Sequence, residues 1–168
     1  MNALVVIQVL LLAYAAMTDI GFRRISNIVC VLLAVLAATQ LPFSDPYLLA
    51  LTFGNAVALL VPLLILYHRG YMGGGDVKLL AAVAIGLSIS QIIQLLTVTV
   101  LAGGVLAVAH LVLRYLPSPK PAPARSSFLR RVYAVERWRH VRRAALPFGV
   151  AIAFGGICSV LSGVDNVV

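Results

Sequence analysis

The chain has 168 residues, of which 62% are hydrophobic and only 11% are charged, whereas soluble domains carry roughly 45–50% apolar and about 25% charged residues. A soluble globule of this size could not bury so much apolar surface. The composition therefore excludes a soluble domain, a disordered chain and a disulfide-rich module, and it predicts an integral membrane protein. The net charge of +8 does not indicate a nucleic-acid partner, because the basic residues lie in three patches separated by long uncharged stretches.

The positions of these patches predict how the chain crosses the membrane. Arg23 and Arg24 form the first patch, Arg69 and Lys78 the second, and the third lies within residues 114–143. An even number of crossings between patches would bring all three to one face, which the positive-inside rule makes the cytoplasmic face. We therefore expect a multi-pass protein of the cytoplasmic (inner) membrane whose basic residues also contact anionic lipid of the inner leaflet.

The first three apolar stretches each predict a membrane helix. Residues 3–17 form the first predicted span, which we expect to be retained rather than cleaved as a signal peptide, because no basic residue precedes it. The second and third predicted spans cover residues 25–41 and 47–67, joined by an outer turn without basic residues.

The remaining apolar sequence predicts three more spans. Residues 79–113 contain no charged side chain apart from His110, and they are too long for one span but long enough for two. We expect the break among residues 86–91, where polar residues gather, and a last span over residues 144–161. The predicted fold is an all-α polytopic membrane protein with six transmembrane helices, both termini outside, and one membrane-embedded domain over residues 1–168.

A basic segment, residues 125–143, precedes the last span. Its apolar residues recur at steps of three and four, which predicts one face of a helix, and arginines dominate the remainder. The apolar positions are Phe128, Val132, Val135, Trp138 and Val141. We expect a basic amphipathic helix on the inner leaflet, serving either as a lipid-anchored connector or as a docking surface for a partner.

Two of the five acidic residues occupy positions where a carboxylate is costly. Asp19 ends the first span and Asp76 begins the fourth, both at the predicted inner face, whereas Asp45, Glu136 and Asp165 lie in a turn, among arginines and near the terminus. A carboxylate at the membrane boundary is a functional candidate unless it is a helix-end residue in contact with water. Two aspartates at the same depth, each within a structured motif, favour function.

The two aspartates suit acid–base chemistry. Asp19 lies at a helix C-terminus, where the backbone dipole opposes ionisation, and Asp76 at a helix N-terminus, where the dipole favours it. If they meet, they should share one proton, so that one carboxylate activates water and the other protonates the leaving amide or polarises its carbonyl. The sequence shows neither metal-ligand spacing nor a Ser or Cys nucleophile with a suitably placed His, and we expect no metal or cofactor.

Three motifs resemble those of type IV prepilin peptidases. Residues 19–27, Asp-Ile-Gly-Phe-Arg-Arg-Ile-Ser-Asn, are similar to the family's first aspartate motif, Asp-x-x-x-Arg-x-Ile-Pro-Asn, with Ser26 in place of the usual proline. Residues 73–79, Gly-Gly-Gly-Asp-Val-Lys-Leu, match its Gly-x-Gly-Asp-x-Lys-Leu motif. Residues 145–149, Ala-Leu-Pro-Phe-Gly, resemble the segment that opens its last helix.

The resemblance implies an aspartic membrane protease that removes the short leader of prepilins and pseudopilins at the cytoplasmic face. Asp19 and Asp76 would form its catalytic pair. The residues that it marks as substrate-binding or site-shaping are Arg23, Asn27, Gly73, Gly75, Lys78 and Pro147. The connection between the first two spans is too short for the methyltransferase domain of the bifunctional branch, so we expect no methylation. The compact chain is similar to the branch that serves tight-adherence (Flp) pili, and an archaeal preflagellin peptidase is the other short form.

Two other functions stay open at this point. Intramembrane proteases of the presenilin and signal-peptide-peptidase type share the Gly-x-Gly-Asp motif, but they carry Tyr-Asp at the first site, where this chain has Thr18-Asp19. A non-enzymatic pilus-assembly or transport subunit could also use two acids at the membrane edge, although carriers place their acids near the bilayer midplane.

Overall fold

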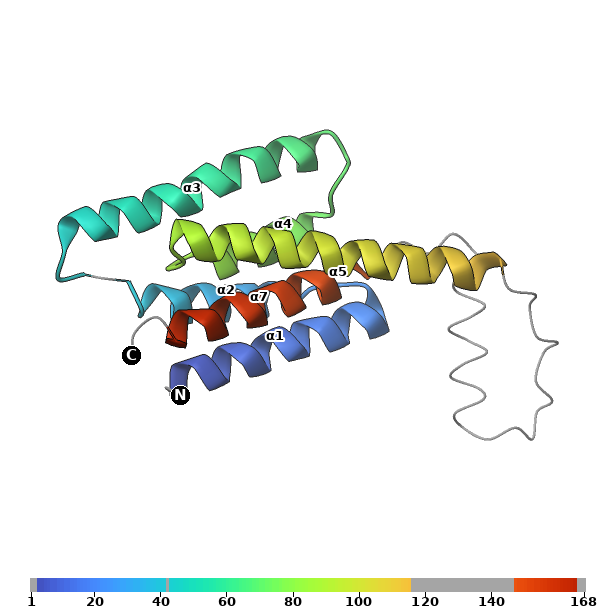
Figure 1. Ribbon diagram of the computed structural model, residues 1–168, viewed down its shortest axis with the longest axis horizontal. Coiled ribbons are helices and arrows are strands. Elements are labelled where there is room, and N and C mark those ends of the chain that lie inside the picture. The colour runs from blue at the N-terminus through green and yellow to red at the C-terminus, as the bar shows by residue number, and fades with distance from the viewer. Residues whose placement is uncertain (1–2, 42, 116–146, 166–168) are drawn as a thin grey trace. The chain divides into compact units, whose positions relative to one another are not determined.

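The computed structural model describes residues 3–41, 43–115 and 147–165, and every regular element in these ranges is a helix (Figure 1). The elements are α1 (Ala3–Phe22), α2 (Asn27–Ala38), α3 (Pro46–His68), α4 (Gly74–Ala84), α5 (Ile89–Tyr115) and α7 (Phe148–Asp165). The predicted all-α fold is confirmed, and the described ranges contain six helices, of which three are long and apolar enough to span a membrane. The predicted basic segment at residues 125–143 lies outside the described residues, and the outward orientation of the termini stays a prediction.

The helices differ in their capacity to cross a membrane. In the described ranges, α1, α3 and residues Ile89–Val112 of α5 are long and apolar enough to span, while α2 and residues Phe148–Gly163 of α7 are shorter apolar helices. This set indicates a multi-pass membrane protein. Helix α4 has only 11 residues, which at 1.5 Å per residue is about 16 Å, or half of a roughly 30 Å hydrocarbon core.

The uncharged stretch at residues 79–113 breaks where the sequence predicts, but it divides unequally. Helix α4 ends at Ala84 and α5 begins at Ile89. Gly86 turns the chain with φ 84°, and a Cβ there would lie 3.0 Å from the backbone oxygen of Ala37. The Ser88 N–H donates to Gln91 Oε1 at 2.8 Å, as in a capping box, which starts the new helix.

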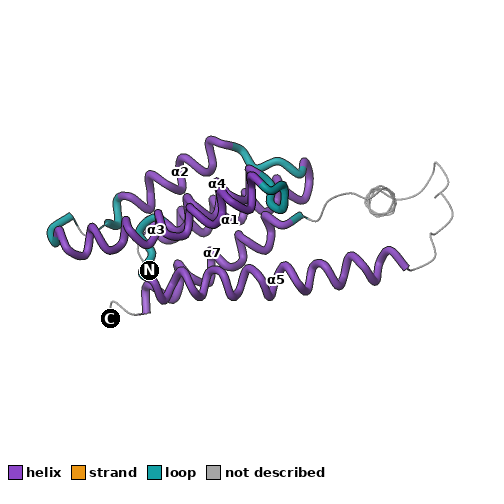
Figure 2. The backbone as a smooth tube through the Cα atoms, turned by 90° about the horizontal axis from the view of Figure 1, so that it is seen from above, coloured by secondary structure: helices purple, strands orange, loops and turns teal. Residues whose placement is uncertain are grey.

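The described residues form two compact units, one containing residues 3–103 and 147–165 and the other residues 104–115. In the first unit, α4 contacts α2, α3 and α7, and α1 packs against α7 and α2. Figure 2 shows these helices side by side. Most of α4 is buried, and the residues concerned are Val77, Leu79, Leu80, Ala82, Val83 and Ala84. Helix α4 therefore lies in the core of this unit, where α2, α3 and α7 cover it.

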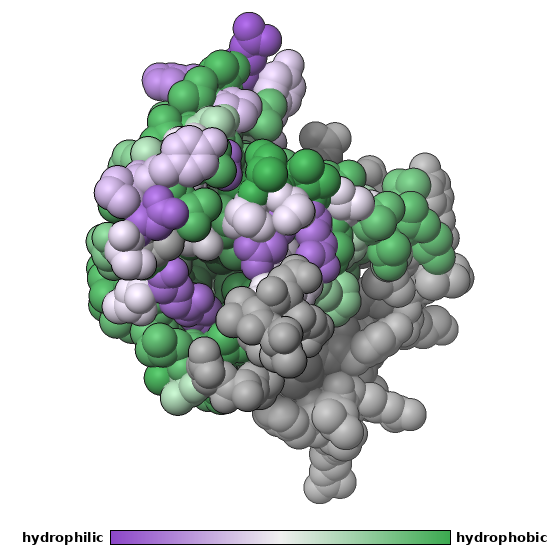
Figure 3. Space-filling model, turned by 60° about the vertical axis from the view of Figure 1, so that its left-hand side comes forward, coloured by the Kyte–Doolittle hydropathy of each residue, from purple (hydrophilic) through white to green (hydrophobic). Residues whose placement is uncertain are grey.

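The outer helices expose apolar side chains, as lipid contact requires. In α3 only Leu59 and Leu63 are buried, while Phe53 and Val61 are more than half exposed. Figure 3 shows apolar side chains over much of the visible surface. A water-soluble helix would bury such a face, so the exposed residues support a membrane setting.

Small residues let α7 approach the first half of α5 closely. Gly155, Ser159 and Gly163 recur every four residues on one side of α7. A Cβ at Gly155 would lie 2.8 Å from the Leu95 backbone oxygen, and Gln91 Nε2 donates to the Ser159 backbone oxygen at 3.5 Å. Such small-residue faces are typical of helix pairs in membranes, and this one positions the helix whose start adjoins Asp19.

Candidate active site

Asp19 is buried in the last turn of α1, with 7% of its surface exposed. It continues a face of α1 whose buried members are Val5, Gln8, Leu12, Ala15 and Asp19. Steps of three and four place these residues on one side of the helix, and α1 packs on α7 and α2. The packing that buries the apolar residues therefore also carries the carboxyl group into the interior.

The Asp19 carboxyl group meets the first turn of α7. The Gly149 N–H donates to Asp19 Oδ2 at 2.8 Å, and the Val150 backbone also hydrogen-bonds this carboxyl group. N–H groups in the first turn of a helix have no partner within the helix, so a side chain from α1 satisfies them here. The dipoles at the end of α1 and the start of α7 act on this carboxyl group with opposite signs, so α7 adds an influence to the one that the sequence predicts from α1.

Asp76 occupies the first turn of α4 and is half-buried. Gly73 is the N-cap of this helix, its backbone hydrogen-bonds the Asp76 carboxyl group, and its C=O accepts from the Val77 N–H at 3.2 Å. This is half of a capping box, in which the third helical residue reaches back to the N-cap N–H. The local backbone therefore holds Asp76 at the start of α4.

The fold brings the two aspartates together. The charge of Asp19 acts on the Asp76 carboxyl group, although 57 positions separate the two residues in the sequence. Helix α7 contacts both α1 and α4, and so connects the two helices that carry the aspartates. Two interacting carboxyl groups titrate as a pair and can hold one proton between them, which is the arrangement required for combined acid and base chemistry.

Each glycine of the run before Asp76 leaves room for a different group. A Cβ at Gly73 would lie 3.1 Å from Asp76 Oδ2, and one at Gly74 would lie 3.1 Å from Cε2 of the Tyr67 ring. A Cβ at Gly75 would lie 3.4 Å from Cβ of Ile25. The run thus permits close contacts with the carboxylate, with the end of α3 and with the connection between α1 and α2.

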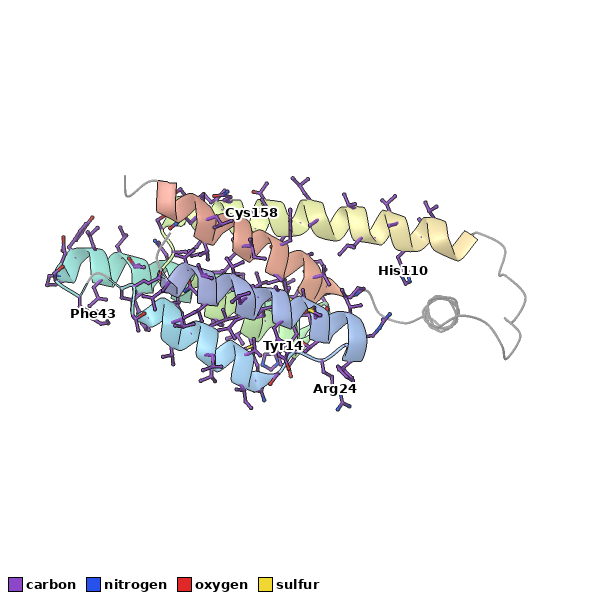
Figure 4. All side chains as sticks on the ribbon, turned by 90° about the horizontal axis from the view of Figure 1, so that it is seen from below. Tyr14, Arg24, Phe43, His110 and Cys158 are labelled. Atoms are coloured by element: carbon purple, nitrogen blue, oxygen red, sulfur yellow. The ribbon has the colours of Figure 1, made fainter. Side chains whose placement is uncertain are left out.

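Arg23, predicted as site-shaping, has an unusual backbone beside Asp19. Its φ is 52°, in the left-handed region, and its N–H donates to the Asp19 backbone oxygen at 2.9 Å, which closes α1. Its charge acts on the Asp19 carboxyl group. Its buried Nη1 has no hydrogen-bond partner among the described residues. The neighbouring Arg24 is exposed and points away from the helices (Figure 4).

Asn27 and Lys78, also predicted as site-shaping, contact each other. Lys78 Nζ donates to Asn27 Oδ1 at 3.0 Å, which joins α4 to the first residue of α2. Both side chains are exposed. A residue that follows Asp19 in the first motif therefore contacts a residue that follows Asp76 in the second.

Pro147, the last predicted site-shaping residue, directly precedes α7, and its C=O accepts from the Val150 N–H at 3.3 Å. Two glycines were not predicted as site residues, Gly74 beside the Tyr67 ring and Gly149 beside Asp19. Both lie in motifs that sequence analysis singled out, but their contacts depend on segments far away in the sequence. Among the described residues, no group of three or more His, Cys, Asp or Glu could hold a metal ion.

The comparisons with known proteins give one finding. A family model described as the type IV leader peptidase family matches residues 6–108, which include both aspartates and the glycine run but not the start of α7. No curated protein and no solved structure matches the chain.

Proposed function

Since the chain belongs to the type IV leader peptidase family, we propose that it is a membrane aspartic endopeptidase that cleaves the short leader from type IV or Flp-type prepilins and pseudopilins. The observation that carries this proposal is the electrostatic interaction of Asp19 with Asp76, two carboxyl groups at the ends of two helices. Cleavage would take place at the cytoplasmic face of the inner membrane, where the exposed Arg24 and Arg69 would contact anionic lipid.

In the proposed mechanism, the two carboxyl groups divide the acid and base roles. One aspartate, as the carboxylate, takes a proton from water, and the resulting hydroxide attacks the scissile carbonyl. The other, as the acid, polarises that carbonyl and then gives its proton to the leaving amide. One carboxyl group gains a proton from water and the other loses a proton to the leaving nitrogen, so the pair holds one proton before and after the reaction.

The neighbouring residues would shape the site rather than react. Gly73 would let an extended substrate backbone approach Asp76, since it carries no side chain that would block it. Gly75 would let the connection between α1 and α2 pack against the start of α4. The contact between Lys78 and Asn27 would hold the two aspartate motifs together, and Pro147 would fix the start of α7.

Leader cleavage by purified enzyme in vesicles tests the catalytic pair directly. Asp19→Asn and Asp76→Asn should each abolish the gel shift of a prepilin substrate, because an amide can neither accept the proton of water nor donate an acidic one. Asp45→Asn is the matched control. Asp45 Oδ1 accepts from the Tyr47 N–H at 2.9 Å, and an asparagine oxygen can keep this cap.

Full cleavage by either variant, Asp19→Asn or Asp76→Asn, would refute the pair. It would also remove the presenilin-like alternative, which needs the same two acids. If the wild-type protein itself cleaved no prepilin, a non-enzymatic pilus-assembly or transport role would be the better explanation for the two membrane-edge carboxyl groups.

A further inference from the structure

The start of α7 contacts Asp19 through its backbone, at Gly149 and at Val150. The Gly149 N–H donates to Asp19 Oδ2 at 2.8 Å across 130 positions of sequence, and the bond is buried. A charge-assisted hydrogen bond of this kind is stronger than one between neutral groups. Since the N–H belongs to a helix, it can move only if the first turn of α7 moves.

The contact requires glycine at position 149. A Cβ there would lie 2.8 Å from Asp19 Oδ2, 2.9 Å from its Cγ and 3.1 Å from its Cβ. These atoms belong to a short, buried side chain with two torsions, so the carboxyl group could not move aside without losing its hydrogen bond. Gly149 therefore permits a distance between α1 and α7 that any other residue would increase.

The first turn of α7 is itself held from the other side. A Cβ at Gly103 in α5 would lie 2.6 Å from Cε2 of the Phe148 ring, so the missing side chain at Gly103 makes room for Phe148. Pro147 restricts the backbone immediately before the helix. The sequence Pro147-Phe148-Gly149 thus combines, in consecutive residues, a restricted backbone before the helix, an aromatic ring packed against Gly103, and an N–H that has no partner within the helix and donates to Asp19.

We propose that residues 147–149 are a positioning element of the catalytic centre, which holds the Asp19 carboxyl group in one orientation relative to Asp76. Gly149 is a positioning residue in this scheme, because it acts through Asp19 and does not touch the reacting atoms. The inference rests on the proposed function for its catalytic consequence, but the hydrogen bond itself can be tested without any peptidase assay.

The kinetic test compares two glycines on α7. Gly149→Ala should lower kcat by about 100-fold with little change in KM, since misplacing a reacting group by about 1 Å has effects of this size. Gly156→Ala is the matched control. A Cβ at Gly156 would lie 3.2 Å from Leu12 Cδ1 and 3.3 Å from Val83 Cγ1, so it would press on apolar atoms and would not meet the Asp19 carboxyl group. Equal losses in both variants, or an active Gly149→Ala, would overturn the proposal.

The second test measures amide hydrogen exchange at the start of α7. Asp19→Ala removes the acceptor and should speed exchange in the peptide that contains Gly149, whereas Asp76→Ala should not. Asp19→Asn keeps an acceptor oxygen and should retain most of the protection while abolishing cleavage. Unchanged exchange in Asp19→Ala, or an equal increase in Asp76→Ala, would disprove the positioning contact even if Gly149→Ala fails to fold.

The two tests separate the failure of this inference from that of the proposed function. If wild-type enzyme cleaves no prepilin but the exchange pattern is as expected, the peptidase assignment fails and the contact of α7 with Asp19 stands. If cleavage depends on both aspartates but the exchange of Gly149 is insensitive to Asp19, the assignment stands and the positioning role fails.

Discussion

At the scale of single residues, Arg23 combines backbone strain with a side chain beside the site. The left-handed position that follows a helix usually belongs to glycine, because a Cβ there clashes with the backbone. Arg23 adopts it with φ 52° while its charge acts on Asp19. Strain of this kind persists where the surrounding structure enforces it, often at functional sites.

Arg23→Gly should therefore make the protein more stable but less active. The variant relieves an unfavourable conformation, so the free energy of unfolding should rise by about 1 kcal/mol, which thermal unfolding in detergent would detect. Leader cleavage should fall, because the positive charge beside Asp19 is lost. Arg24→Ala, at the exposed neighbour, should leave cleavage unchanged. A fully active Arg23→Gly variant would contradict the site role, and a less stable one would contradict the strain.

At the scale of elements, the connection between α1 and α2 tolerates a departure from the family motif. Ser26 replaces the usual proline, but it is the N-cap of α2 with φ −68° and ψ 131°, and its side chain makes no capping hydrogen bond. Proline restricts φ to about −65°. The Ser26 C=O accepts from the Val29 N–H at 3.1 Å, and a proline at this position would keep this hydrogen bond. The serine therefore occupies a backbone conformation that already suits proline.

Ser26→Pro should stabilise the protein and leave cleavage intact. Fixing a φ that the native state already adopts reduces the entropy of the unfolded chain and is expected to add about 0.4–1 kcal/mol. The midpoint of thermal unfolding would measure the gain. Ser26→Ala, which removes the hydroxyl group without restricting φ, should show no such gain. A lower midpoint for Ser26→Pro would show that the proline ring clashes with its surroundings.

At the scale of the whole molecule, the distribution of charge predicts the orientation in the membrane. The connection between α3 and α4 begins with the basic Arg69, whereas the described residues between α2 and α3 include no basic side chain. The positive-inside rule then predicts that the connection between α3 and α4 is cytoplasmic and that the connection between α2 and α3 is external. Both aspartates would then lie on the cytoplasmic side, as the connection between α3 and α4 does.

Cysteine labelling would test this orientation in a background of Cys30→Ala and Cys158→Ala, which removes both free thiols. Ser44 and Tyr71 are exposed in the two connections. A membrane-impermeant reagent added outside should label Ser44→Cys but not Tyr71→Cys. The reverse pattern would place the aspartates on the outer side, away from a cytoplasmic leader.

The sequence by itself determined the helical class and the approximate positions of the helix breaks, and it identified the two aspartates as candidate site residues. These features are local: apolar length specifies a membrane helix, and Gly86 with the polar residues after it marks a bend. An aspartate at the edge of an apolar stretch can be recognised without knowing its neighbours in space. Lys78 and Asn27, which contact each other, can each be recognised from the sequence because each belongs to an aspartate motif.

Only the tertiary structure decided how these pieces meet. The unequal lengths of α4 and α5 depend on the helices that bury α4, and the distinct contacts of Gly73, Gly74 and Gly75 depend on three different segments. The bond from the Gly149 N–H to Asp19 joins residues 130 positions apart. No local sequence pattern encodes this hydrogen bond, because it depends on the close packing of α1 on α7. That packing is a property of both helix surfaces together.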